Sequence, residues 1–401
     1  MTDKTKRTLR LLPCPAYDVE GLESYLAEQA QNGLHLCPDG IWAGFALFSR
    51  GCPRRVSYRL EAAPKSTSLW ADNGGRPDDE AIALAEKYGW SYVAKRGSFF
   101  VFRSDAADAR ELNTDPAVQA IALDAVRRRE RAAVVSSLFW ALVYPVIAMR
   151  GHVLLTMIQA GTIFILLGLA LLLWQLVTSI ARAFHLGRLR RKLLEQGALD
   201  HRRDWRRRAA RYRVSRVLRS ALAVVWAVWL LVTLNTQLLE ANALPLTLVS
   251  EPPPFATLAD FAPDGVYRAS DIGRSNTVRE WHDCLAPRSI RWQEAASIRL
   301  PDSSTLAGGL YVDYHETASP WLARALMREY RRQDRLWFAK IGGEQVMSAA
   351  DEVFFFQDEL ELPTILVRYQ NKVMRVLFFQ TSDSSLPLET WIAIMVDSLM
   401  S

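Results

Sequence analysis

The sequence predicts a mixed α+β protein in which three membrane-spanning helices separate two folded domains. Two observations lead to this fold class. Three uncharged, apolar stretches lie within residues 132–239, where a bilayer core about 30 Å thick has to be crossed by apolar helices. The regions before and after them, residues 1–105 and 240–401, combine strand-like and helix-like patterns with Gly- and Pro-containing turns.

Residues 1–105 are numerous enough to form a small domain with its own core. Apolar residues at three- and four-residue spacing predict helices, and short apolar runs with aromatic residues predict strands. The expected elements are a strand at 6–12, a helix at 18–32, strands at 42–48 and 56–60, a helix at 80–88 and a hairpin at 91–103. This order is typical of a ferredoxin-like domain, an antiparallel sheet with two helices on one face.

A charged, helix-prone linker at 106–131 leads into the three apolar stretches, which cover residues 132–149, 151–181 and 220–239. A transmembrane helix needs about 20 predominantly apolar residues. The second and third stretches meet this length, and the first meets it marginally. None carries an acidic or basic residue in its middle part, and ionisable side chains within a span are the usual mark of an ion pathway. A channel or transporter is therefore not expected.

The distribution of charge predicts how the spans are oriented. The loop at 182–219 carries fourteen Lys and Arg residues against three acidic ones. From Glu240 onward the chain has 15 Lys and Arg against 22 Asp and Glu, a net charge of −7, whereas the preceding residues have 34 against 21, a net charge of +13. Because basic residues beside spans stay on the cytoplasmic side, we expect a multi-pass protein of the cell membrane with its N-terminus in the cytoplasm and its C-terminus outside.

The basic loop also contains leucines among its cations, a pattern typical of an amphipathic helix that lies along the inner membrane surface. Anionic lipid headgroups attract such clusters. The residues predicted to contact the membrane surface are Arg190, Arg191, Lys192, Arg206, Arg207 and Arg208. A solvated basic face, or an acidic protein partner, would explain the same pattern. Since topology accounts for the positive charge, direct binding of nucleic acid is not expected.

Residues 240–401 predict a second α+β domain with a largely antiparallel sheet. Strand-like patterns cover 290–300, 310–314, 353–357, 364–369 and 373–379, and helices are expected at 320–333 and 388–400. Candidate catalytic residues are few. Asp313 and His315 share one face of a strand, with Glu316 beside them, but two ligands do not make a metal site. The tripeptide His282-Asp283-Cys284 lacks a third, orienting group. We therefore predict no catalytic residue, metal or cofactor.

Short motifs in the N-terminal region resemble a known family. They are Cys14-Pro15-Ala16-Tyr17-Asp18, Leu22-Glu23-Ser24-Tyr25-Leu26, Asn32-Gly33-Leu34, Tyr58-Arg59-Leu60 and Tyr88-Gly89-Trp90-Ser91-Tyr92-Val93, followed by a Phe-rich strand. Residues 1–105 resemble the uncharacterised bacterial membrane-protein family called domain of unknown function 2812. The resemblance implies a small cytoplasmic domain tethered to membrane helices, a PadR-type regulator as partner, and a regulatory or sensory role. It offers no catalytic residues.

The two-sided layout predicts a non-enzymatic, membrane-anchored sensor or regulatory protein that links an outer binding domain to a cytoplasmic interaction domain. Its expected partners are the lipid bilayer and a PadR-type regulator or another protein. Two alternatives stay open. The chain could instead serve as an accessory or structural subunit of a membrane or envelope complex, or act outside the membrane as a hydrolase that uses Asp313, His315 and Glu316.

Overall fold

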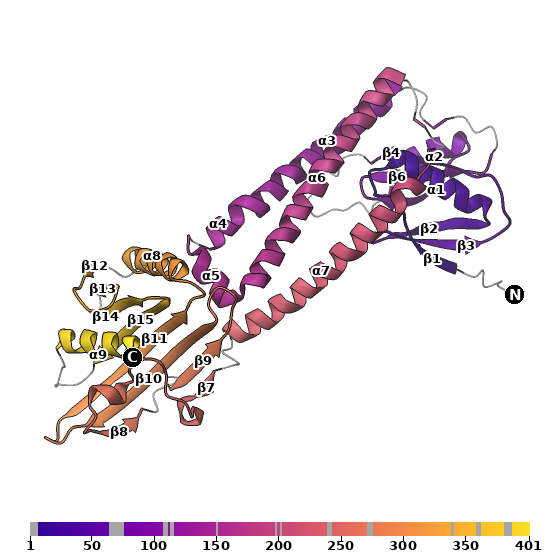
Figure 1. Cartoon of the computed structure of the whole chain (residues 1–401). Helices are drawn as coiled ribbons and strands as arrows, with labels where there is room; N and C mark the ends of the chain where they lie inside the picture. Colours follow the sequence, from indigo (N-terminus) through magenta and orange to yellow (C-terminus); the bar gives the residue numbers. More distant parts are fainter. Residues whose placement is uncertain are drawn as a thin grey trace. The chain divides into compact units, whose positions relative to one another are not determined.

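The computed structural model describes residues 7–63, 76–106, 111–112, 116–149, 151–196, 199–200, 203–238, 243–270, 276–337, 341–357, 362–380 and 387–401. Its sheets and its three long apolar helices confirm the predicted mixed α+β class (Figure 1). Contacts between residues divide the chain into two compact units. The first comprises Met1–Val143 with Leu169–Val224, and the second comprises Tyr144–Gly168 with Val225–Ser401.

The N-terminal domain, within the first unit, consists of two β-α-β-β repeats. The first has β1 (Arg7–Leu11), α1 (Val19–Gln31), β2 (Leu34–Trp42) and β3 (Phe45–Arg50), and the second has β4 (Ser57–Ala62), α2 (Asp79–Lys87), β5 (Ser91–Arg96) and β6 (Phe99–Ser104). Each repeat forms a three-stranded antiparallel sheet with the same pairing, β1-β3-β2 and β4-β6-β5. A common core that includes Leu26, Phe48 and Val101 joins the two repeats.

This repeated topology corrects the ferredoxin-like prediction, which assigned a single sheet and began the second strand at residue 42. The missed strand is β2. Its apolar pattern is interrupted by Pro38-Asp39-Gly40, where the strand contains a bulge between Leu36 and Ile41 and Asp39 adopts a φ of 48°. Pro, Asp and Gly are typical of turns, so a sequence pattern alone favours a turn where the chain forms a bulged strand.

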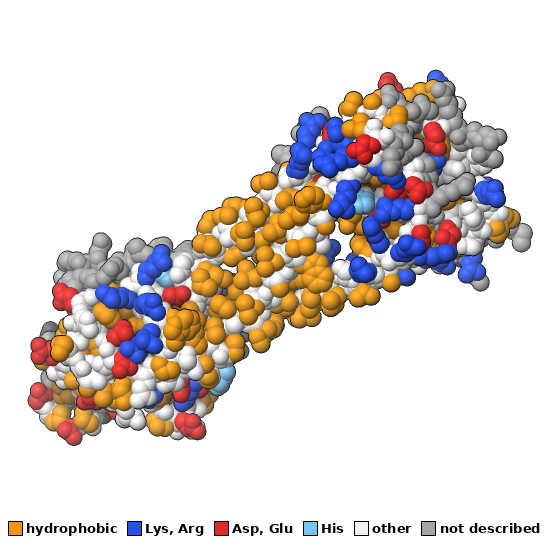
Figure 2. Space-filling view, turned by 45° about the horizontal axis from the view of Figure 1, so that its top comes forward, with side chains coloured by type: hydrophobic (Ala, Val, Ile, Leu, Met, Phe, Trp, Pro, Cys, Tyr) orange, Lys and Arg blue, Asp and Glu red, His pale blue; other side chains and the backbone are white. Residues whose placement is uncertain are grey.

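Among the described residues, three helices are long and apolar enough to span a membrane, namely Pro116–Ile147, Thr162–Glu195 and Arg206–Asn235. The first contains α3 (Pro116–Leu138), a π-helical turn η1 (Phe139–Val143) and α4 (Tyr144–Ala148), and the others are α6 (Thr162–Gln196) and α7 (Arg206–Leu238). Figure 2 shows hydrophobic side chains over most of the visible surface in the middle part of these helices. Exposed apolar residues on them include Val146, Ile163, Val177, Val228 and Leu231.

The second span begins later than the sequence predicts. Residues 153–160 form a separate helix, α5 (Val153–Ala160), which ends at Gly161, where φ is 98°. Leu155 and Ile158 of α5 are buried in a core of the C-terminal domain, within the second unit. The predicted stretch 151–181 is therefore divided, because its first part is used for packing against protein.

The basic loop at 182–219 also differs from the prediction of a separate amphipathic helix. α6 continues without a break to Gln196, and α7 starts at Arg206. Most of these cations therefore lie on extensions of two spanning helices. Residues 197–198 and 201–202 of the loop, and residues 107–110 and 113–115 of the predicted linker, lie outside the described residues.

The C-terminal domain is built on a nine-stranded antiparallel sheet with the order β12-β13-β14-β15-β11-β10-β9-β7, and β8 pairs with β10. Its pairing agrees with the antiparallel sheet predicted from the sequence. The elements are β7 (Leu244–Pro245), η2 (Leu246–Leu248), η3 (Leu258–Phe261), β8 (Val266–Ala269), β9 (Thr277–Trp281), β10 (Arg288–Arg299), β11 (Thr305–Glu316), α8 (Pro320–Trp337), β12 (Ile341–Gln345), β13 (Glu352–Gln357), β14 (Pro363–Tyr369), β15 (Lys372–Gln380) and α9 (Leu388–Met400).

Helices α8 and α9 cover opposite faces of this sheet, because neighbouring residues of a strand point to opposite sides. In β14, Leu366 packs in one cluster with Leu326 and Tyr330 of α8. The adjacent Ile365 packs in another cluster with Trp391 of α9. The central strand β14 is therefore buried on both sides, and polar residues on the α8 face need partners inside the protein.

Candidate functional site

The N-terminal domain is attached to the basic extension of α6 and to the segment before α7 through Glu20, in the first turn of α1. The side chain is buried, with 2% of its residue surface exposed. Its carboxylate accepts hydrogen bonds from the Lys192 ammonium, from the Arg203 guanidinium at 2.9 Å and from the Asp200 amide at 2.9 Å. One buried carboxylate thus binds cations that follow it by more than a hundred residues in the chain.

These contacts also determine the charge of Glu20. Burial by itself would raise the pKa of the carboxyl group, but the hydrogen bonds from Lys192 and the Asp200 amide outweigh burial and hold the pKa below its ordinary value. Glu20 is therefore ionised at neutral pH. A buried ion is tolerated only when it is paired and hydrogen-bonded, so this attachment depends on the cations opposite.

A second carboxylate on the same helix, Glu28, provides another contact. It accepts a hydrogen bond from the Trp205 indole at 3.0 Å and pairs with Arg206 at 2.5 Å. The Trp205 ring also meets Tyr25 edge-on, with centroids 5.0 Å apart. Residues eight apart on a helix lie near the same face, which explains how Glu20 and Glu28 reach the segment before α7 together.

An apolar contact accompanies these ion pairs. Val19 and Phe99 of the N-terminal domain pack with α3 and α6 in one buried cluster, whose helical members are Leu123, Val126, Leu186, Leu189 and Leu193. On the same helices, Arg190 pairs with Asp124 at 2.9 Å. Leu186, Leu189 and Leu193, three of the four leucines that suggested a membrane-surface helix, therefore face the protein interior, whereas Leu194 is exposed.

The turn between β2 and β3 makes a further contact with α7. Arg216 donates hydrogen bonds to the carbonyl oxygens of Ala43 and, at 3.1 Å, of Gly44. Gly44 has a φ of 78°, and a Cβ at this position would collide with the Arg216 guanidinium. The absence of a side chain at residue 44 therefore favours both this backbone conformation and the close approach of the arginine.

The six residues predicted to contact the membrane surface divide into two groups. Arg190, Lys192 and Arg206 form the ion pairs described above. The other three, Arg191, Arg207 and Arg208, are exposed, and Arg207 lies 3.5 Å from Asp204. Sequence reasoning missed the carboxylates that bind the first group, although the acidic residues along one face of α1 could have suggested a basic partner.

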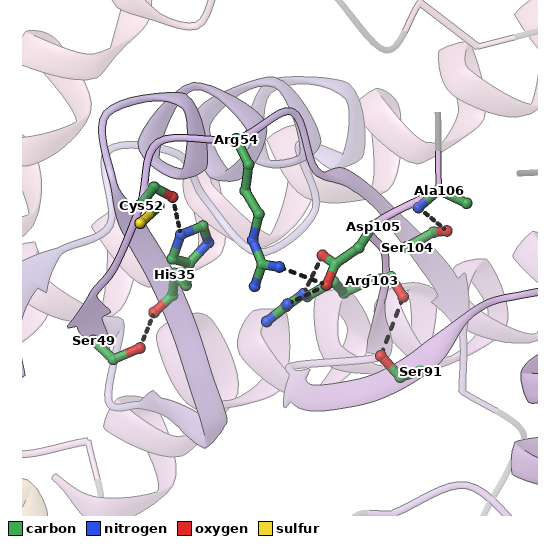
Figure 3. Close-up of polar contacts among 9 residues, drawn as sticks. All are labelled: His35, Ser49, Cys52, Arg54, Ser91, Arg103, Ser104, Asp105 and Ala106. Atoms are coloured by element: carbon green, nitrogen blue, oxygen red, sulfur yellow. Dashed lines mark hydrogen bonds and ion pairs between the residues drawn. The ribbon is translucent and has the colours of Figure 1, made fainter. Parts of the chain in front are cut away.

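A polar cluster in the N-terminal domain holds the connection between its two repeats (Figure 3). His35 Nε2 lies 3.0 Å from the Cys52 carbonyl oxygen. Asp105, which follows β6, pairs with Arg103 at 2.6 Å and with Arg54 of the connection at 3.2 Å. The hydrogen bond from Arg103 holds the pKa of Asp105 below its ordinary value. The cluster therefore fixes the end of the second repeat to the start of the segment that connects the two repeats.

Two carboxylates of the C-terminal domain bind the first turns of helices in the second unit. Asp283 accepts hydrogen bonds from the Thr162 amide at 2.8 Å and from its hydroxyl at 2.6 Å, at the start of α6. Glu329 of α8 accepts from the amides of Leu154 and Leu155, at 3.0 and 2.9 Å, at the start of α5. The first amides of a helix have no partner within it, so these side chains act as caps.

Asp313 and His315 lie on one face of β11, as predicted, but this face is covered by α8. His315 is fully buried, with Nδ1 2.9 Å from the Ser289 hydroxyl and Nε2 2.8 Å from the Tyr330 hydroxyl. Asp313 pairs with Arg291 at 2.8 Å. Burial lowers the pKa of His315 to about 4, so the ring is neutral near pH 7. The cluster is an internal hydrogen-bonding network.

The tripeptide His282-Asp283-Cys284 also divides its side chains between different environments. Asp283 caps α6, whereas His282 and Cys284 are exposed. Within the described part of the chain, no group of three His, Cys, Asp or Glu side chains is placed to hold a metal ion.

These features define the class of the protein. It combines three helices that are long and apolar enough to span a membrane with two α+β regions, each attached to helix ends by buried or capping carboxylates. Residues 18–135 match the model of a family described as Protein of unknown function (DUF2812), which confirms the N-terminal resemblance. No curated protein and no solved structure matches the chain.

Proposed function

We propose that the protein is a non-enzymatic, membrane-anchored sensor or regulatory protein that links an outer binding domain to a cytoplasmic interaction domain. The observation that carries the proposal concerns α6. This helix is continuous from Thr162 to Gln196. Its first turn is capped by Asp283 of the C-terminal domain, and near its other end Lys192 bonds to Glu20 of the N-terminal domain.

Such an arrangement can transmit a signal if a ligand binds one state of the C-terminal domain more tightly than another. A state in which Asp283 leaves Thr162 would expose the first turn of α6, and a shift or loosening of the helix would then act on the Lys192 contact. The loss of a cap and the shift of a helix each change the protein between two distinct states. Coupling between two distant sites depends on an element that has two such states.

The proposed sidedness places the N-terminal domain in the cytoplasm. It is supported by the basic residues on the extensions of α6 and α7, because such residues stay inside. Two exposed native cysteines allow a direct test, since Cys52 belongs to the N-terminal domain and Cys284 to the C-terminal domain. A membrane-impermeant maleimide should label Cys284 in intact cells and Cys52 only after permeabilisation. Labelling of Cys52 in intact cells would refute the orientation.

The regulatory role predicts a cytoplasmic protein partner, for which a PadR-type regulator is the first candidate. The test is an affinity purification of the tagged full-length chain from gently solubilised membranes, followed by mass spectrometry. Recovery of a transcriptional regulator, lost on deletion of residues 1–105, would support signalling. Recovery of envelope proteins alone would contradict it and favour an accessory subunit.

A further inference from the structure

A pocket of ≈ 590 Å³ in the first unit lies between the N-terminal domain, α6 and α7. Tyr17 lines it from the segment before α1, Phe184 and Arg188 from α6, and Arg208 and Arg211 from α7. None of these five residues takes part in the ion pairs through which Glu20 and Glu28 attach the domain. The pocket is therefore a separate feature of the same interface.

Its wall carries an excess of positive charge. Arg188, Arg208 and Arg211 are exposed, and none forms an ion pair within the described ranges of the chain. The carboxylate in the wall, Asp18, accepts a hydrogen bond from the Gly21 amide at the start of α1. The wall thus contains three guanidinium groups and one carboxylate. The remaining positive charge is available to bind an external anion.

The basic residues of this region therefore form two sets with different uses. Lys192, Arg203 and Arg206 bond to carboxylates of the N-terminal domain, as described above. The three arginines of the pocket retain hydrogen-bonding capacity for a ligand. The planar guanidinium group suits phosphate oxygens, which it can bind through two parallel hydrogen bonds.

His185 adds a second, independent observation. His185 lines the pocket, and its Nε2 atom is enclosed by protein and has no hydrogen-bond partner among the described residues. The ring lies beside Tyr17, with centroids 5.2 Å apart. An enclosed polar atom without a partner costs about 1–3 kcal/mol, and an oxygen of a ligand in the pocket would supply the missing bond if the ring turned toward the pocket.

The apolar part of the wall indicates the kind of anion. Phe184, which is 69% exposed, and Ala181 lie where the uncharged part of α6 gives way to its basic extension. Basic pockets between membrane helices on the cytoplasmic side bind lipid headgroups. We propose that the pocket binds the phosphate of an anionic phospholipid headgroup, with the acyl chains along the apolar surface of α6. The inference rests on the proposed membrane span and does not require the sensor role.

The test measures lipids retained by the purified full-length protein. Native mass spectrometry would count phosphatidylglycerol and phosphatidylcholine bound after exposure to mixed micelles of both. The pocket variant carries Arg188→Gln, Arg208→Gln and Arg211→Gln. The matched control carries Arg191→Gln, Arg207→Gln and Arg213→Gln, which removes the same charge from exposed positions of the same helices outside the pocket. All six residues are exposed, so both variants should fold.

We expect the wild-type protein to retain phosphatidylglycerol preferentially, the pocket variant to bind it at least about tenfold more weakly, and the control to stay within about twofold. Equal losses in both variants, or no preference for the anionic lipid, would overturn the proposal. Soluble glycerol phosphate provides a second arm. If it binds as tightly as the lipid, the assignment to a membrane lipid is wrong. The sensor proposal is tested by other residues, so the two can fail separately.

Discussion

The two domains are attached to their helices by different physical means. In the N-terminal domain, Glu20 pairs with the side chains of Lys192 and Arg203, whereas in the C-terminal domain Asp283 and Glu329 bind the first amides of helices. An ion pair needs charge on both partners, and its exposed part is weakened by salt. A cap needs only one acceptor. The N-terminal attachment is therefore the more easily altered by mutation and salt.

Glu20→Ala should have the largest effect on this comparison. The variant leaves Lys192 and Arg203 without their carboxylate, and breaking a buried ion pair costs about 3 kcal/mol. Hydrogen exchange in the full-length protein should show this loss as faster opening of α1, with little change in β11. Glu86→Gln, at an exposed position of α2, is the control and should leave α1 unchanged. Normal protection of α1 in Glu20→Ala would refute the importance of the pair.

Mild acid should destabilise the C-terminal domain before the N-terminal attachment. The pKa of His315 is about 4 in the folded protein against an ordinary 6.5. The unfolded chain thus binds more protons between these values, and stability falls as pH decreases from 6.5 toward 4. At pH 5 the loss is about 2 kcal/mol. Glu20, whose pKa is lowered from 4.5, keeps its contribution until the pH falls below that value.

This difference can be measured by exchange of β11 and α1 at several pH values, with intrinsic rates taken into account. A His315→Gln variant should lose the acid sensitivity of β11. If that variant retains the full effect, another group is responsible and the explanation based on His315 is incorrect.

Asp283→Ala should destabilise the start of α6 by about 1 kcal/mol, the usual cost of losing a helix cap. The amides of residues 162–165 should exchange faster, because the Thr162 amide and hydroxyl lose their acceptor. Asp302→Ala, in the exposed turn between β10 and β11, is the matched control. Equal exchange in the two variants would show that the cap contributes nothing.

Arg206→Gln should have the smallest effect. Its side chain is largely exposed although it pairs with Glu28, and exposed ion pairs contribute about 0.5 kcal/mol or less. Thermal unfolding of the variant should nearly coincide with that of the wild type at high salt. A large loss would mean that the exposed pair is as important as the buried one.

Much of the fold could be predicted from local patterns. The hairpin formed by β5 and β6 and the strands β14 and β15 fall where the sequence indicates them. Apolar length alone identifies the three long helices. Local patterns fail where tertiary contacts decide. The bulge at Asp39 resembles a turn, and α5 resembles part of a span although Leu155 and Ile158 pack against protein.

Only part of the candidate site could be predicted from the sequence. Clusters of Arg and Lys stand out, but which of them bind a carboxylate depends on Glu20 and Glu28, which are distant in the chain. The cation positions could therefore be predicted and their partners could not. The burial of His315 could not be predicted either, because it depends on the packing of the distant helix α8 over β11.

The central proposal is that the two domains communicate through α6, and hydrogen exchange of the full-length protein in lipid nanodiscs tests it most directly. The comparison is between wild type, Asp283→Ala and the Asp302→Ala control. If the domains are coupled, Asp283→Ala should alter exchange both in residues 162–165 and in α1. The expected change in α1 is about fivefold, which corresponds to the lower end of typical coupling free energies. If only residues 162–165 respond and α1 exchanges as in the wild type, the proposed communication is contradicted.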